Sequence, residues 1–204
     1  MAEPSKTRAT YADLEAVPPH LVAEILDGSL VTHPRSSPRH GGSASALAMR
    51  LGSAFQFGYN GPGGWVFIVE PELHLGSHVA VPDIAGWRLE NLPEYPKTNY
   101  FTVAPDWICE VLSASTERRD RTVKTRIYAE QGIPYFWIID PRQQMLEAFG
   151  LREGQWVLFG SWSADDIVSE PPFGAISFSL ADLWPLDKPL GFGEDPQALY
   201  AGDR

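Results

Sequence analysis

The stretch from Asp106 to Pro141 constrains the fold more than any other part of the chain. Two short apolar segments flank a charged segment with helical character, a pattern typical of a strand–helix–strand crossover. Strands joined in this way lie parallel and commonly pair with each other. We therefore predict parallel central strands at Trp107–Leu112 and Tyr135–Ile139, with a helix at Glu117–Gln131 packed across them.

The ends of this helix are well marked in the sequence. Ser115 and Thr116 are candidate N-caps, Gly132 suits a left-handed residue after the last turn, and Pro134 prevents continuation. On this helix Lys124 is expected at the rim of the buried face, although a solvated surface lysine is the common role of such a residue.

Glu110 interrupts the first apolar segment. An unpaired carboxylate inside a buried strand is costly. It is therefore either a satisfied structural carboxylate, an edge position, or a metal ligand or acid–base group at a strand end.

The rest of the chain predicts further helices and hairpins within one domain, 1–204, with a core at about 11–184 and loosely packed tails at 1–9 and 190–204. We expect short helices at Tyr11–Ala16 and Ala181–Trp184, a longer helix from His40 to Phe57, and a loop at Arg88–Ala104. Predicted strands are Leu21–Leu26, Ser29–His33, Trp65–Glu70, Leu73–Leu75, Val79–Val81, Pro82–Trp87, Leu146–Leu151, Trp156–Trp162 and Phe173–Phe178.

The composition indicates the cellular compartment of the protein and the ligands that it does not bind generally. The single cysteine, Cys109, allows no intramolecular disulfide, Met1–Thr10 lacks the apolar core of a signal peptide, and no window is long enough to span a membrane. We therefore expect a cytoplasmic protein. The net charge of −10 argues against a protein that coats nucleic acid generally, but it does not exclude an enzyme that binds nucleic acid locally.

Three acids on predicted strands, Glu24, Asp83 and Glu110, combine with Lys124 into a set that phosphodiester hydrolysis requires. Carboxylates bind hard cations such as Mg²⁺, which lower the pKa of a bound water and neutralise phosphate charge. A nearby lysine can orient that water, assist its deprotonation or stabilise the pentavalent state. Spacing alone does not establish the site, because several acids and a lysine occur in most proteins of this length.

The chain resembles the Uma-two family of bacterial endonucleases, in the PD-(D/E)XK nuclease superfamily. The resemblance extends from about Tyr11 to Trp184. It is most specific in the central block, which comprises Pro105–Thr116, then Lys124, Tyr128 and Gly132, and finally Tyr135–Pro141. The other matching stretches are Ile25–Gly28, Ser37–His40 and Pro82–Ile84. The resemblance implies an α/β (α+β) fold with a restriction-endonuclease-like mixed sheet flanked by helices, extra β-hairpins, and a metal-dependent nuclease site.

The resemblance also implies site residues. Asp83 and Glu110 take the two acid positions, and the carbonyl of Val111 is a further metal ligand. The lysine of the superfamily motif would fall at position 112, where this chain has Leu112, so the role passes to Lys124 on the following helix. Glu24, His40 and Tyr128 are assigned supporting roles. The candidate phosphate contacts are Arg118, Arg119, Arg121 and Arg126. Basic residues on a helix more commonly form a solvated face.

We therefore expect a Mg²⁺- or Mn²⁺-dependent nuclease, acting as a homodimer, that hydrolyses DNA phosphodiester bonds with a metal-activated water. One alternative is a catalytically inactive nucleic-acid- or protein-binding module of the same fold, since fold does not determine function. Another is a glycosidase using Asp83 and Glu110 as an acid–base pair, which would need neither metal nor Lys124.

Overall fold

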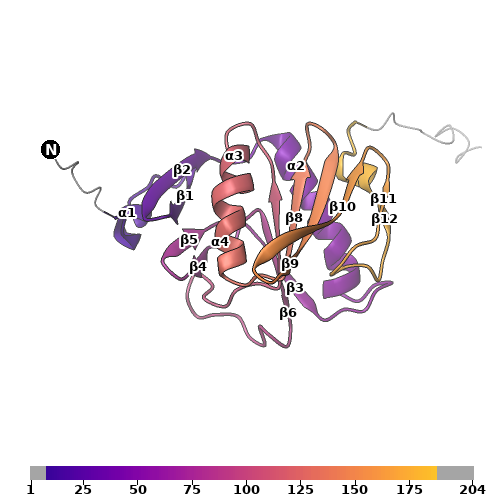
Figure 1. The fold of residues 1–204 in the computed structure, drawn as a ribbon, viewed down its shortest axis with the longest axis horizontal. Coiled ribbons are helices and arrows are strands. Elements are labelled where there is room, and N and C mark those ends of the chain that lie inside the picture. The colour runs from indigo at the N-terminus through magenta and orange to yellow at the C-terminus, as the bar shows by residue number, and fades with distance from the viewer. Residues whose placement is uncertain (1–7, 188–204) are drawn as a thin grey trace, which may run out of the picture.

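The computed structural model describes residues 8–187 of the chain and has a mixed α+β fold around a six-stranded sheet (Figure 1). The strand order in this sheet is β10-β9-β8-β7-β6-β3. Its strands are β3 (Trp65–Val69), β6 (Ile84–Arg88), β7 (Trp107–Val111), β8 (Tyr135–Asp140), β9 (Met145–Arg152) and β10 (Gln155–Ser163).

The predicted crossover forms the centre of this sheet. Strands β7 and β8 pair in parallel, with Glu110 opposite Ile138, while the other neighbours in the sheet are antiparallel. The connecting helix is continuous but changes type, and runs through α3 (Glu117–Arg119), the π-helical segment η2 (Asp120–Lys124) and α4 (Thr125–Glu130). The prediction of two parallel central strands with a helix between them is confirmed.

The predicted helix ends are confirmed in part. Gly132 adopts φ +71, the left-handed conformation expected after the helix. Thr116 occupies the N-cap position, but its side chain makes no capping hydrogen bond. Instead the Oγ of Ser113 accepts a hydrogen bond from the Thr116 backbone N–H at 3.3 Å, so the hydroxyl that serves this helix end lies three residues earlier than expected.

Two apolar cores cover the two faces of the six-stranded sheet. Residues alternate along β7, so that Cys109 lies in the core beneath α2 (Pro38–Leu51) while Ile108 lies in the core beneath α4. The predicted helix from His40 to Phe57 is α2, continued by the π-helical segment η1 (Gly52–Gln56). Glu110 follows the alternation of Ile108 and therefore faces the α3–α4 helix.

A second, four-stranded sheet with the order β2-β1-β5-β4 lies beside the first (Figure 1). Its strands are β1 (Leu21–Leu26), β2 (Ser29–Pro34), β4 (Leu73–Leu75) and β5 (His78–Ala80), and the short helix α1 (Tyr11–Glu15) precedes them. The turn between β1 and β2 uses Asp27 at φ 52 and Gly28 at φ 71, the positive values that a two-residue hairpin requires. The predicted Asp-Gly hairpin is thus confirmed.

One predicted strand is wrong. Of Phe173–Phe178, only Phe178 is in a strand, namely β12 (Phe178–Ser179), which pairs with β11 (Ile167–Val168). The apolar residues of this stretch serve a different purpose, since Phe173 contacts the rings of Phe55, Trp65, Phe67, Trp107 and Trp137 in the core. An apolar segment can therefore be a buried loop whose side chains pack in the core.

One short helix lies near the C-terminal end of the described residues. The short helix expected at Ala181–Trp184 is the 3₁₀ helix η3 (Leu180–Leu183). Most of the two predicted tails, 1–9 and 190–204, lies outside the described residues. Within residues 8–187, none of the helices has both the length and the apolar composition to cross a membrane.

Candidate functional site

A pocket of about 180 Å³ lies between the two sheets, next to the start of the α3–α4 helix. It brings together residues from the hairpin β1–β2, the start of α2, strand β7 and the helix. Its lining residues are His33, Pro34, Arg35, Ser36, Ser37, His40, Val81, Asp83, Glu110, Ser113, Ser115, Thr116, Asp120 and Lys124. The three residues predicted to be catalytic, Asp83, Glu110 and Lys124, all line it.

The two carboxylates among the predicted metal ligands lie on or next to neighbouring antiparallel strands. Asp83 lies immediately before β6 rather than within it, and Glu110 is the fourth residue of β7. The Val111 N–H donates a hydrogen bond of 2.7 Å to Oδ2 of Asp83, which fixes that carboxylate against β7. Burial raises the pKa of Glu110 well above its usual range, Lys124 opposes this, and the charges of Asp120 and Asp83 raise it further.

Lys124 is buried rather than placed at the rim of the helix, with 2% of the residue exposed. Its Nζ lies 2.7 Å from Oε1 of Glu110 and 3.1 Å from Oε1 of Glu24, and it donates a hydrogen bond of 3.1 Å to the Val81 carbonyl. Burial alone lowers the pKa of this lysine, but the Glu110 and Glu24 charges outweigh burial and raise it well above its ordinary value. The charges of Glu110 and Glu24 therefore favour the protonated form of Lys124.

Two of the predicted supporting residues, Glu24 and Tyr128, complete the surroundings of Lys124 and Glu110. Glu24, on β1, is fully buried and accepts a hydrogen bond of 2.9 Å from the Val81 N–H. The Tyr128 hydroxyl donates a hydrogen bond of 2.5 Å to Oε1 of Glu110. Burial, followed by the Glu110 charge, raises the pKa of Tyr128 well above its ordinary value, so the hydroxyl keeps its proton.

His40 contacts the other acid. It lies in the first turn of α2, where Pro38 begins the helix and the Oγ of Ser37 accepts the His40 N–H, and its Nε2 is 3.2 Å from Oδ1 of Asp83. Burial lowers the pKa of His40, but the hydrogen bond and charge of Asp83 outweigh burial, so the net shift is upward. This imidazole contacts Oδ1 of Asp83, while the Val111 N–H holds Oδ2.

Asp120 is a pocket residue for which sequence reasoning found no functional role. It is 4% exposed and lies one turn before Lys124. Burial raises its pKa above the ordinary value, although Lys124 and a hydrogen bond with Thr116 oppose this, and the charges of Asp83 and Glu24 raise it further. Its position four residues before Lys124 was visible in the sequence, but aspartate among arginines is typical of a solvated helix surface.

The predicted arginine contacts do not line the pocket. Arg121 pairs with Glu117 at 3.6 Å and Glu147 at 2.7 Å, and Arg126 pairs with Asp27 at 2.7 Å and Glu130 at 2.8 Å. Arg119 approaches the buried Glu24 at 3.5 Å, and Arg118 is exposed. The basic stretch is thus largely neutralised by carboxylates of the same chain.

The donor atoms in this pocket fit a hard divalent cation that keeps several waters. Among residues 8–187, no three His, Cys, Asp or Glu side chains converge on one point. Mg²⁺ does not need such a cage, because it is commonly bound by one or two carboxylates with waters and substrate phosphates. Asp83 and Glu110 provide two carboxylates in one pocket, and the hydrogen bond and ion pair made by Glu110 use Oε1 and leave Oε2 for another ligand.

Comparisons with known proteins identify the family and the fold of the chain. A family model described as "Uma2: Putative restriction endonuclease" matches residues 8–181. Among solved structures, the chain is similar to "a putative nuclease belonging to DUF820" from Anabaena variabilis, with 22% sequence identity and a TM-score of 0.70 over 87% of this chain and 98% of that chain. At 22% identity, this similarity shows that the two chains share a fold and shows nothing about activity. A search of curated proteins finds no match.

Proposed function

The chain belongs to the Uma2 family of restriction-endonuclease-like proteins, and from this premise we propose that it hydrolyses DNA phosphodiester bonds with the help of Mg²⁺ or Mn²⁺. The observation that carries the proposal is one pocket that gathers Asp83 and Glu110 with a buried Lys124, whose Nζ lies 2.7 Å from Oε1 of Glu110. Two carboxylates with one fixed cation are the groups needed to hold a metal and to balance the charge of a phosphate.

Each residue has a distinct task in this proposal. Asp83 and Glu110 would hold the cation, with the Val111 carbonyl as a further ligand. A bound Mg²⁺ would supply a water of lowered pKa and neutralise phosphate charge. Since Lys124 keeps its proton, it is unsuited to deprotonating water, and its task is to stabilise the negative charge that grows on the phosphate.

His40, Tyr128 and Glu24 position these groups. His40 and the Val111 N–H hold the two oxygens of Asp83, Tyr128 holds Oε1 of Glu110, and Glu24 shares Lys124 with Glu110. Partners of this kind fix the orientation of metal-ligating groups and commonly contribute 10–100-fold, as an order of magnitude, in metal affinity or activity.

Incubation of the protein with single-stranded, double-stranded and supercoiled DNA, in Mg²⁺, Mn²⁺ or EDTA, tests the function. We expect cleavage with either metal and none with EDTA. Asp83→Asn and Glu110→Gln should each abolish Mg²⁺ binding in calorimetry. Undiminished affinity in both variants would place the metal elsewhere, and DNA binding without cleavage in any metal would favour an inactive binding module.

The catalytic role of Lys124 needs a separate test. Lys124→Met should lower the single-turnover cleavage rate by about 10²–10³-fold, as for loss of one well-placed donor, measured at a temperature where circular dichroism shows the variant folded. The control is Lys97→Met, because Lys97 is exposed in the loop between β6 and β7. Cleavage by Lys124→Met at the parent rate would remove the lysine from the mechanism.

We also propose that the protein forms a homodimer. Three large apolar side chains, Leu89, Tyr95 and Val103, are 51%, 62% and 43% exposed on or beside the loop between β6 and β7, and contiguous exposed apolar surface commonly marks an interface. Light scattering over a wide concentration range is the test. A mass that stays near 22.6 kDa would show a monomer.

A further inference from the structure

We propose that Asp120 is a third acidic residue of the cation site, which faces the cation across the pocket and holds it through a water molecule. The inference rests on the proposed function and adds a residue that neither the strand pattern nor the family motif indicated. Three observations carry it: the placement of Asp120 by the π-helical turn, the incomplete charge balance around it, and an unpartnered polar atom in the same pocket.

The π-helical turn directs Asp120 into the pocket. In an ideal α-helix a step of four residues overshoots the 3.6-residue turn, so that a row at this spacing drifts around the helix. In η2 the Thr125 N–H donates to the Asp120 carbonyl five residues earlier, which widens the turn. Asp120, Lys124 and Tyr128 are accordingly all buried on the side of the helix that faces Glu110, with exposures of 4%, 2% and 0%.

The carboxylate of Asp120 lacks a close cation. Lys124 is 3.9 Å away, and its ammonium already contacts Glu110 at 2.7 Å and Glu24 at 3.1 Å. The cluster around the pocket, when ionised, contains four carboxylates, those of Glu24, Asp83, Glu110 and Asp120. Facing them are the cations Lys124 and Arg119 and the imidazoles of His33 and His40, which are charged only when protonated. Negative charge is thus in excess when the imidazoles are neutral, and Asp120 contributes to it.

A buried polar atom without a hydrogen-bond partner belongs to a residue that lines the same pocket. His40 is 7% exposed and lines the pocket, and within residues 8–187 its Nδ1 has no hydrogen-bond partner. A buried ring nitrogen without a partner is costly, so it points to a polar occupant such as water. Since no three acidic or imidazole side chains of the described residues converge, Asp120 acts on a water of the cation rather than on the cation itself.

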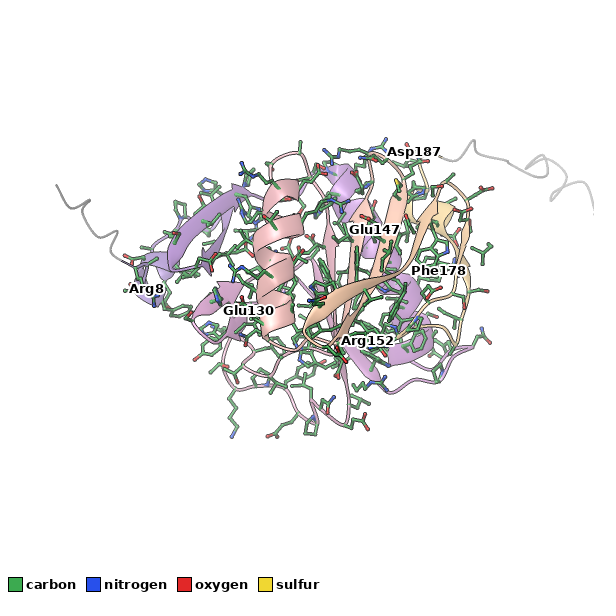
Figure 2. All side chains as sticks on the ribbon, in the orientation of Figure 1. Arg8, Glu130, Glu147, Arg152, Phe178 and Asp187 are labelled. Carbon is green, nitrogen blue, oxygen red and sulfur yellow. The ribbon has the colours of Figure 1, made fainter. Side chains whose placement is uncertain are left out.

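The test compares Asp120→Asn with a matched charge change on the same helix. The control is Glu130→Gln, because Glu130 is exposed and lies near the lower end of that helix in Figure 2. Calorimetric titration with Mg²⁺ and with Mn²⁺ should show about 10–100-fold weaker binding for Asp120→Asn and near-parent binding for Glu130→Gln. The melting temperature of metal-free Asp120→Asn should be equal to or above that of the parent, because a poorly compensated buried carboxylate is removed.

Each result has one meaning. Parent-like affinity of Asp120→Asn overturns the inference while leaving the proposed function intact, provided that Asp83→Asn still abolishes binding. A lower melting temperature combined with parent-like affinity would show that Asp120 is a structural residue. If the parent binds neither metal, or if Asp83→Asn binds as the parent does, the proposed metal site fails and the inference about Asp120 fails with it.

Discussion

The two faces of the α3–α4 helix use charge in opposite ways. On the exposed face, Arg121 and Arg126 each pair with two carboxylates, yet exposed pairs contribute about 0–1 kcal/mol each to stability. On the buried face, Lys124 meets Glu24 and Glu110 out of contact with water, where desolvation cancels much of the attraction but removal of one partner is severe. The difference teaches that the exposed pairs contribute little to stability, whereas each member of the buried cluster depends on its partners.

The largest effect is expected when the buried cation is removed. Lys124→Met leaves Glu24 and Glu110 buried without their shared partner, so the free energy of unfolding should fall by about 3–5 kcal/mol. Urea denaturation followed by circular dichroism measures this change. A loss below about 1 kcal/mol would mean that the buried and exposed faces do not differ as described.

A smaller effect is expected at Asp140, which is buried while its partner Arg142 is partly exposed. Burial raises the pKa of Asp140, but hydrogen bonds from Arg142 and backbone N–H groups outweigh burial, so the net pKa lies below 3.8. A depressed folded-state pKa stabilises the protein above pH 3.8 and the benefit disappears as pH falls through the folded value. Asp140→Asn should therefore destabilise by about 1.5–3 kcal/mol at pH 7.

The pH dependence checks the cause of this effect. Urea midpoints of the parent and of Asp140→Asn should converge as pH falls below 3.8, the ordinary pKa of an aspartate, because the pKa of folded Asp140 lies lower. A difference that stays constant down to pH 2.5 would assign the loss to packing rather than to the charge of the carboxylate.

Tyr128→Phe should have a more modest effect within the buried face. The variant removes one hydrogen bond to Glu110 but leaves Lys124 in place, so we expect a loss of about 1–2 kcal/mol in the free energy of unfolding. The same denaturation assay measures it. If Tyr128→Phe is as damaging as Lys124→Met, the hydroxyl and not the ammonium is the main partner of Glu110.

The smallest effect is expected on the exposed face. Arg126→Met breaks the pairs with Asp27 and Glu130, in which the side chains are about half exposed, and should change stability by about 0.2–1 kcal/mol. The small effect should shrink further in 1 M salt, since screening weakens exposed pairs. A salt-independent loss of several kcal/mol would contradict the contrast between the two faces.

Much of the fold could be predicted because it depends on local patterns. The crossover strands, the Gly132 helix end and the Asp27-Gly28 turn follow from apolar runs and from residues that favour particular backbone conformations. Phe173 shows the limit of this approach, since its apolar side chain is buried among distant aromatic rings without belonging to a strand.

The site was predictable in its residue types but not in its surroundings. Asp83, Glu110 and Lys124 were expected to meet, and they line one pocket. The depth of Lys124 depends on Glu24 in the smaller sheet and on Val81, which directly follows β5, and the orientation of Asp120 depends on a π-helical turn. The first arises only when segments far apart in sequence pack together, and the second is a local change of helix type that the spacing of residues does not reveal.

The position of Lys124 between two sheets has a consequence for the order of folding. Its carboxylate partners come from β1 in the smaller sheet and β7 in the larger one, and such long-range contacts require large loops to close first. A chain in which only one sheet has formed therefore lacks an assembled site. Any activity of this pocket would therefore depend on the docking of the two sheets.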